Sequence, residues 1–290
     1  MKQSPHTVTK SNQECPVCRQ LSDRRMFSLG AGSLFRCRMC DTAFYSPRPT
    51  ACELSDFYAS QTYRDDYKSG DMVGEEFAGN RYCQFAQALR QYDEDIFNEN
   101  SRRLLDIGCG TGDFLKIARQ NDWQVAGVEV SQDAVLEANK KLERDCVSLE
   151  LADQLQGNRN AYSVITSYHV IEHLLAPLAM LKQAHELLKP GGIIFIETPN
   201  IGGLGARLLG ERWSQLKPVE HINYFNRRSL FFALREAGFV DITTMTIRPQ
   251  KIQSVANFPQ IVQGIMLAAY EIVPKLNLGA SLQGIATKPR

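Results

Sequence analysis

Short apolar runs alternate with helix-like stripes along the second half of this chain. Residues 104–107 form an apolar run that ends in a glycine-rich turn, and an amphipathic pattern over 113–118 follows at once. Such short runs predict buried strands, and the stripes between them predict helices. We therefore expect an α/β fold. Further strands are expected at residues 123–130, 146–151, 162–170 and 192–198.

The two ends of this pattern add a leading helix and two closing strands. Residues 79–97 show a helical stripe, while 239–248 and 280–288 predict strands. Between those strands, within an insertion near 250–276, residues 261–273 predict an apolar helix. It could be a core helix, a dimer contact or a membrane-surface helix. We expect it to cover the substrate site, because it lacks the Lys and Arg flank typical of membrane-surface helices.

Three glycines after the first strand indicate a ligand site. Gly108, Gly110 and Gly112 have G-x-G-x-G spacing, and a strand, glycine turn and helix let the backbone approach a nucleoside-bearing ligand closely. Asp106 stands just before the turn, where a carboxylate would repel the pyrophosphate of NAD. The same carboxylate would attract the sulfonium and α-ammonium groups of S-adenosylmethionine (SAM). The sequence therefore predicts SAM as the ligand.

Two further acids are placed to contact such a ligand. Glu129 ends the second predicted strand, about twenty residues after the glycine turn, where it can accept hydrogen bonds from ribose hydroxyls. Ser131 then caps the next helix. Asp153 stands just past the third predicted strand, where it could accept a hydrogen bond from the adenine amine.

Together these motifs resemble the class I SAM-dependent methyltransferases, over roughly residues 80–250. The resemblance implies a Rossmann-like, seven-stranded sheet and transfer of a methyl group to a small-molecule or sugar-like acceptor, as in the ubiquinone-biosynthesis type. One departure is Tyr162-Ser163, where the family often has Phe-Asp; that Asp is not usually a ligand contact. The matching segments are 104–112, 127–131, 169–174 and 188–192.

Four cysteines near the N-terminus predict a metal site. Cys15, Cys18, Cys37 and Cys40 form two C-x2-C pairs, whose spacing is typical of a Zn²⁺ site with four thiolate ligands. A site of this kind has no open coordination position, so we expect the zinc to be structural. Unrelated thiols or a redox pair are the alternatives. The remaining cysteines (Cys52, Cys83, Cys109 and Cys146) are interpreted as ordinary buried or partly buried thiols.

These motifs divide the chain into three parts. We expect a zinc ribbon over 1–50, a lid and leading helix over 51–100, and a methyltransferase domain over 101–290. The aromatic segment 53–69 is either a lid over the cofactor or a plain linker. Residues 1–14 lack the apolar segment of a signal peptide, and no apolar run approaches eighteen residues. We therefore expect a cytoplasmic protein without a transmembrane segment. A homodimer is one option, in which the apolar helix over 261–273 would form the contact.

Charge gives little support for a nucleic-acid partner. The net charge is +1, and the eight bases and three acids of residues 1–50 are followed by eleven acids and four bases in 51–100. An acidic neighbour opposes a polyanion, so nucleic acid is unlikely but not excluded. Between the fifth strand and His221, basic and aromatic side chains could favour an anionic or sugar-like substrate. They are Arg207, Arg212, Trp213 and Lys217.

Two histidines are the candidates for a catalytic base. His173 and His221 should lie at the carboxyl edge of the sheet, where open α/β folds bind their ligands. An imidazole can accept a hydroxyl proton near neutral pH. His169 is a weaker candidate, and Glu172 could orient a histidine or begin a helix. All these histidines could instead be structural. The alternative functions are an RNA methyltransferase that uses the zinc ribbon, and a SAM-binding protein without turnover.

Overall fold

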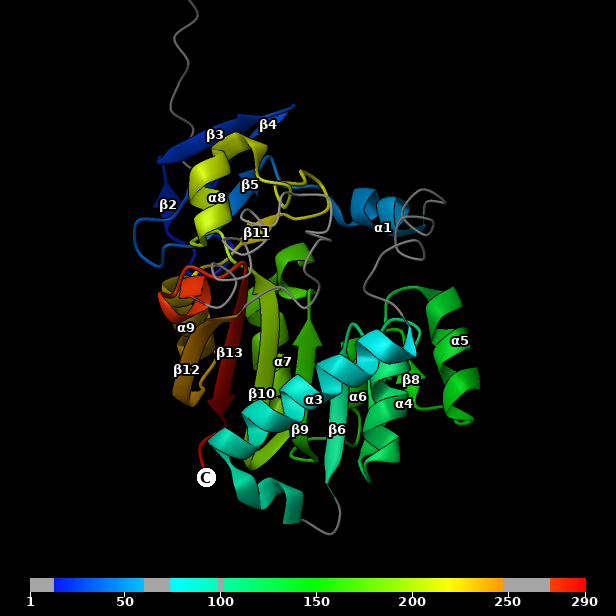
Figure 1. The fold of residues 1–290 in the computed structure, drawn as a ribbon. Helices are drawn as coiled ribbons and strands as arrows, with labels where there is room; N and C mark the ends of the chain where they lie inside the picture. Colours follow the sequence, from blue (N-terminus) through cyan, green and yellow to red (C-terminus); the bar gives the residue numbers. More distant parts are fainter. Residues whose placement is uncertain (1–12, 60–73, 99–101, 248–271) are drawn as a thin grey trace, which may run out of the picture.

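A seven-stranded sheet forms the centre of the protein (Figure 1). The computed structural model describes residues 13–59, 74–98, 102–247 and 272–290. The strand order β12-β13-β10-β9-β6-β7-β8 confirms the expected seven-stranded α/β sheet. All neighbours from β10 to β8 are parallel, and β13 is antiparallel to both β10 and β12. The strands are β6 (Arg103–Ile107), β7 (Gln124–Val128), β8 (Val147–Ser148), β9 (Tyr162–Tyr168), β10 (Leu188–Pro199), β12 (Val240–Ile247) and β13 (Ser281–Thr287).

Helices cover both faces of this sheet. Successive side chains of a strand pack alternately against the helices on one face and on the other. On β9, Val164 packs into one apolar cluster and Ile165 into the other, and both side chains are fully buried. This is why the strands read as continuous apolar runs. The helices are α3 (Glu75–Tyr92), α4 (Asp113–Gln120), α5 (Gln132–Leu142), α6 (Leu151–Leu155), α7 (Pro177–Leu187), α8 (Leu204–Leu209) and α9 (Arg227–Glu236), with α1 (Ala51–Ala59) before them.

Helix α3, the expected leading helix, lies across one face of the sheet (Figure 1). Phe85, which is fully buried, holds it there through aromatic contacts. Its ring centroid lies 5.7 Å from those of Phe114 and Phe195, and 6.0 Å from that of Trp123. A short 3-10 helix, Glu94–Asn98, completes the predicted stripe.

The cysteine-bearing segment forms a second sheet that includes a strand from far along the chain. Its own strands are β3 (Arg25–Leu29), β4 (Gly32–Arg36) and β5 (Ala43–Ser46), preceded by the short pair β1 (Gln13–Glu14) and β2 (Leu21–Ser22). Strand β11 (Asn223–Tyr224) pairs with β5, with Asn223 opposite Phe44. The cysteine-bearing segment thus lies beyond the carboxyl ends of the parallel strands (Figure 1).

The predicted cap at Ser131 was confirmed, because its hydroxyl accepts a hydrogen bond from the Ala134 amide at the start of α5. At the start of α9, Asn226 forms a capping box with Ser229. Within the described ranges, no helix is long and apolar enough to cross a membrane.

Two predictions were wrong. Cys52 and Cys83 are exposed, because they lie on the outer faces of α1 and α3. The third strand is limited to Val147–Ser148, and the polar positions after it form helix α6. Most of the proposed lid and of the inserted helix, at 60–73 and 248–271, lies outside the described residues.

Candidate functional site

The glycine turn after β6 has a conformation that only glycine adopts easily. Gly108, Gly110 and Gly112 all have positive φ angles, of 80°, 54° and 80°. A Cβ atom on Gly108 would lie 2.2 Å from Cγ2 of Val170, so a side chain is excluded there. The amide of Gly108 donates to the Val128 carbonyl at 2.7 Å, which ties the turn to the end of β7.

Two of the predicted acids flank this turn. Asp106 is 3% exposed and accepts a hydrogen bond of 2.7 Å from the Thr166 hydroxyl. Burial raises the pKa of the Asp106 carboxyl to about 7. Glu129 accepts hydrogen bonds of 3.0 Å from the amides of Gly110 and Ser131, so it links the turn to the start of α5. Asp153 lies exposed in the first turn of α6, and its contact with adenine stays a prediction.

Arg81 is a charged residue near Asp106 that the sequence did not indicate. It comes from α3, and its guanidinium lies 4.4 Å from the centroid of the Tyr168 ring, at the carboxyl end of β9. Its positive charge favours the ionised form of Asp106 and so works against the burial that raises the pKa of that carboxyl. A single Arg within a helical stripe gives no signal of this role.

His173 and His221 lie together, although 48 positions separate them. Their ring centroids are 4.8 Å apart. Nδ1 of His173 is 2.8 Å from the Glu220 carbonyl oxygen, and Nδ1 of His221 is 2.9 Å from that of Gln215. A carbonyl oxygen only accepts, so each Nδ1 carries a proton, and in the neutral form of either ring the lone pair is on Nε2.

Glu172 faces these two rings from the short 3-10 helix Ile171–His173. It is 1% exposed and accepts a hydrogen bond of 2.9 Å from the Thr198 hydroxyl. Its Oε1 lies 3.9 Å from Nε2 of His173, and one ligand atom from each of Glu172, His173 and His221 lies within 4.8 Å of the others. These three side chains could hold a metal ion or an acceptor hydroxyl.

His169 has a different environment from the other two histidines. Its ring lies 3.3 Å from the Glu172 carboxylate and 3.7 Å from that of Glu197. Burial opposes protonation, but the two carboxylates outweigh it and raise the pKa of His169 to about 9. In contrast, burial lowers the pKa of His221 to about 4. His169 therefore serves as a charge partner for Glu172, while His221 stays neutral.

Strand β11 connects this histidine cluster to the cysteine-bearing segment. The Ile222 amide donates to the Glu172 carbonyl at 2.9 Å, and the Tyr45 amide of β5 donates to the Ile222 carbonyl at 3.0 Å. The buried Asn223 amide donates to the carbonyl oxygens of Ile171 and Leu174, at 3.1 and 2.7 Å. The backbone that carries Glu172 and His173 is therefore held by hydrogen bonds from β11.

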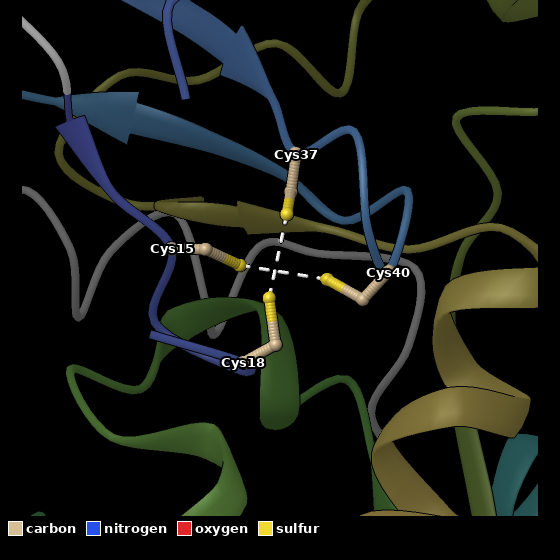
Figure 2. Close-up of side chains that lie close together, drawn as sticks. All are labelled: Cys15, Cys18, Cys37 and Cys40. Carbon is tan, nitrogen blue, oxygen red and sulfur yellow. Dashed lines mark hydrogen bonds between the residues drawn. The ribbon is translucent and has the colours of Figure 1, made fainter. Parts of the chain in front are cut away.

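The four cysteines converge on one point (Figure 2). Sγ of Cys15 lies 3.5 Å from that of Cys40, and Sγ of Cys18 lies 3.4 Å from that of Cys37. Tetrahedral coordination at about 2.3 Å places sulfur atoms roughly 3.8 Å apart, so the four thiols fit a Zn²⁺ ion. The contact between Cys15 and Cys40 lowers the pKa of the Cys40 thiol and raises that of Cys15, so one thiolate of this pair forms readily and the second needs a cation.

The sheet order, the glycine turn and the flanking acids define a class I SAM-dependent methyltransferase fold, as the sequence resemblance implied. Comparison with known families agrees: the family described as "Methyltransferase domain" matches residues 75–244, and the chain belongs to this family.

Sequence relatives and solved structures support the same class. The chain is 28% identical to the ubiquinone biosynthesis O-methyltransferase of Ruegeria pomeroyi over 166 residues, which covers 52% of this chain and 66% of that protein. It is 32% identical to that of Idiomarina loihiensis over 107 residues, which covers 34% of this chain and 43% of that protein. The matches thus span less than two thirds of these relatives.

Among solved structures, a SAM-dependent methyltransferase from Archaeoglobus fulgidus superposes with a TM-score of 0.53 at 21% identity, covering 79% of this chain and 100% of that one. The plantazolicin methyltransferase BamL, in complex with an analog and SAH, gives a TM-score of 0.54 at 16% identity, covering 82% and 95%. At these identities the likeness shows a shared fold.

Proposed function

We propose that this protein transfers the methyl group of SAM to an oxygen atom of a small-molecule acceptor. The observation that carries the proposal is the pairing of the His173 and His221 rings, each held through Nδ1, beside the buried Glu172 carboxylate. An acceptor hydroxyl placed there meets two hydrogen-bond acceptors. The curated relatives are named for O-methylation in ubiquinone biosynthesis, which supports oxygen as the receiving atom.

In this proposal SAM lies over the glycine turn, on the side of the sheet edge next to the histidines. The Asp106 carboxylate is placed for the cationic methionine portion, and Glu129 for the ribose hydroxyls. Asp153 is assigned to the adenine amine, and Arg81 is the nearby cation that suits the α-carboxylate of SAM. Because β9 lies between β6 and β10, its carboxyl end adjoins both the glycine turn and the Glu172 cluster.

The chemistry asks mainly for positioning, because the sulfonium is already activated. The acceptor hydroxyl donates its hydrogen bond to Nε2 of His173 or His221. As the oxygen lone pair forms a bond to the methyl carbon, the C–S bond breaks and its electrons stay on sulfur, which leaves neutral S-adenosylhomocysteine. The hydroxyl proton moves to the histidine Nε2, where the Glu172 carboxylate stabilises the imidazolium.

A divalent cation at the same cluster is an alternative route to the same product. Both Nδ1 atoms are bound to backbone carbonyls, the arrangement that orients histidine ligands for a metal through Nε2. Glu172 would supply the third ligand. A bound cation would lower the pKa of the acceptor hydroxyl and replace the histidine as the agent of deprotonation.

We also propose a structural Zn²⁺ at Cys15, Cys18, Cys37 and Cys40. The convergence of four largely buried sulfurs supports it, since burying several thiolates together without a cation is unfavourable. Four protein ligands fill the coordination sphere, so this ion takes no part in methyl transfer.

The test is incubation of the protein with methyl-labelled SAM and fractionated cell extract, with label counted in small-molecule, glycan, RNA and protein pools. We expect label in the small-molecule pool. His173→Gln and His221→Gln should slow transfer by about 10²-fold or more with SAM affinity intact, whereas the matched control His185→Gln, outside the cluster, should not. Full activity after EDTA treatment would favour the histidine base over the cation. Label in RNA would contradict the proposal.

A further inference from the structure

A cavity lies between the cysteine-bearing segment and the methyltransferase domain. Its volume is about 830 Å³, within the range of small-molecule sites. Met26 and Phe27 of β3 line it on one side, and Trp213 and residues 276–278 line it elsewhere. It therefore offers apolar and aromatic surface for a ring-sized group.

The charged residues of this cavity are mostly arginines. Arg36 comes from β4, Arg207 from α8, and Arg227 and Arg228 from the start of α9. Asp41 is the one carboxylate among the described lining residues. Three separate segments thus bring four arginines to one cavity.

Asp41 does not neutralise this charge. One of its oxygens accepts a hydrogen bond of 2.7 Å from the Asn226 side chain, and the other lies 3.6 Å from Nε of Arg36. That Nε is buried without a hydrogen-bond partner. An anion between these side chains would pair with the positive charge that Asp41 leaves unbalanced.

The cavity adjoins the histidine cluster on two sides. Asn200, in its wall, stands two residues after Thr198, whose hydroxyl donates to Glu172. Trp213 packs on Tyr224 with ring centroids 6.4 Å apart, and Tyr224 in turn lies 6.3 Å from His221. The rings of Trp213 and Tyr224 therefore lie in series between the cavity and His221.

We propose that this cavity binds a phosphate or pyrophosphate group of the methyl acceptor, with the arginines as its ligands and Trp213 beside the attached ring. Planar guanidinium forks match phosphate oxygens. Arg227 and Arg228 each donate one hydrogen bond to a backbone carbonyl, of Thr244 and Met39, and each guanidinium has further N–H groups for an anion. The inference rests on the proposed function, because it identifies the class of acceptor for the same histidine cluster.

The test is calorimetric titration of the full-length protein with inorganic pyrophosphate at fixed salt. Arg207→Met and Arg228→Met remove exposed side chains and should leave the fold intact. Each is expected to weaken pyrophosphate binding by about tenfold. Arg235→Met is the matched control, since Arg235 lies exposed on the same helix but outside the cavity, beside Glu236.

The outcomes separate this inference from the proposed function. No pyrophosphate binding by the wild type, or equal binding by the two cavity variants and the control, overturns the cavity site. SAM affinity, titrated on the same samples, should be unchanged in every variant. If the wild type did not bind SAM, that result would contradict the methyltransferase proposal. The pyrophosphate titration would still decide whether the cavity binds phosphate groups. A labelled product whose charge is unaffected by phosphatase would also overturn a phosphorylated acceptor.

Discussion

Arg48 donates a hydrogen bond of 3.0 Å to the carbonyl oxygen of Leu174, the residue after His173. The same guanidinium donates to the Leu175 carbonyl and to the Asn223 side chain, each at 3.0 Å. Burial lowers the pKa of Arg48 to about 10, so the side chain stays charged at neutral pH. The segment that carries the cysteines is thus tied directly to the loop that carries the candidate base.

We predict that Arg48→Met destabilises the protein and slows methyl transfer. The substitution leaves two carbonyl oxygens and an amide oxygen without their charged donor, which costs about 2–3 kcal/mol in the free energy of unfolding. Denaturant titration measures this change. Arg38→Met is the control, because Arg38 forms an exposed ion pair with Asp23 and should have little effect. Equal stability of the two variants would contradict the role of Arg48.

Loss of the proposed zinc should impair the distant histidine cluster. Loss of the ion frees β5, whose partner β11 supports Glu172, and a shift of about 1 Å at a reacting group can cost 10²-fold in rate. We predict that Cys37→Ser lowers both the melting temperature and the transfer rate, with zinc content measured by metal analysis. Cys83→Ser, at an exposed thiol, should change none of the three. A zinc-free variant with normal activity would refute this link.

Regular elements could be predicted because their signals are local. The alternation of apolar runs and stripes located β6, β9, β10 and helix α4, and Ser131 marked the true start of α5. Strand β11 could not be predicted. It has only two residues, and its place depends on β5, nearly 180 positions earlier, rather than on its own sequence. The same holds for Arg48, whose partners are set by tertiary structure.

SAM affinity should depend on the protonation of Asp106. The pKa of this carboxyl in the folded, ligand-free protein is about 7, above its usual 3.8, so it is mostly neutral below pH 7. A cationic ligand prefers the carboxylate; affinity should therefore fall by up to about tenfold per pH unit below 7. Titration calorimetry between pH 5 and 7.5 measures this. Asp106→Asn should bind weakly and lose the pH dependence, and a flat wild-type profile would contradict the assignment.

The same pKa shift affects folding with a definite sign. Between pH 4 and 7 the folded protein holds the Asp106 proton that the unfolded chain releases. This residue therefore makes the protein less stable as pH rises through that window, and its contribution is constant above pH 7. Comparison of wild type and Asp106→Asn by denaturant titration isolates the effect. If the difference in free energy of unfolding between wild type and Asp106→Asn did not change between pH 4 and 7, Asp106 would not be protonated in that range.

Helix α3 should depend on a single aromatic side chain. Phe85→Ala empties a fully buried position among Phe114, Trp123 and Phe195, and should lower the free energy of unfolding by about 3–5 kcal/mol. Phe231→Ala is the matched control at a partly exposed ring. If both substitutions lowered the free energy of unfolding by a similar amount, the aromatic contacts of Phe85 would not be what holds α3 on the sheet.

The candidate site could be predicted in part. Asp106 lies near the end of β6, while the three glycines and Glu129 follow strand ends, and the parallel sheet brings such positions together. The pairing of His173 with His221 depended on a loop whose path the sequence does not specify. The charge on His169 depended on Glu197, which read as one more residue of a buried strand.

The position of β13 has a consequence for synthesis of the protein. Residues Ser281–Thr287 fill the space between β10 and β12, and each of those strands pairs with β13 rather than with the other. On the ribosome, β12 therefore has no partner at its place in the sheet until Thr287 has emerged. In a nascent chain that stalls before this point, β10 is an edge strand, and its unpaired backbone groups are available to other strands.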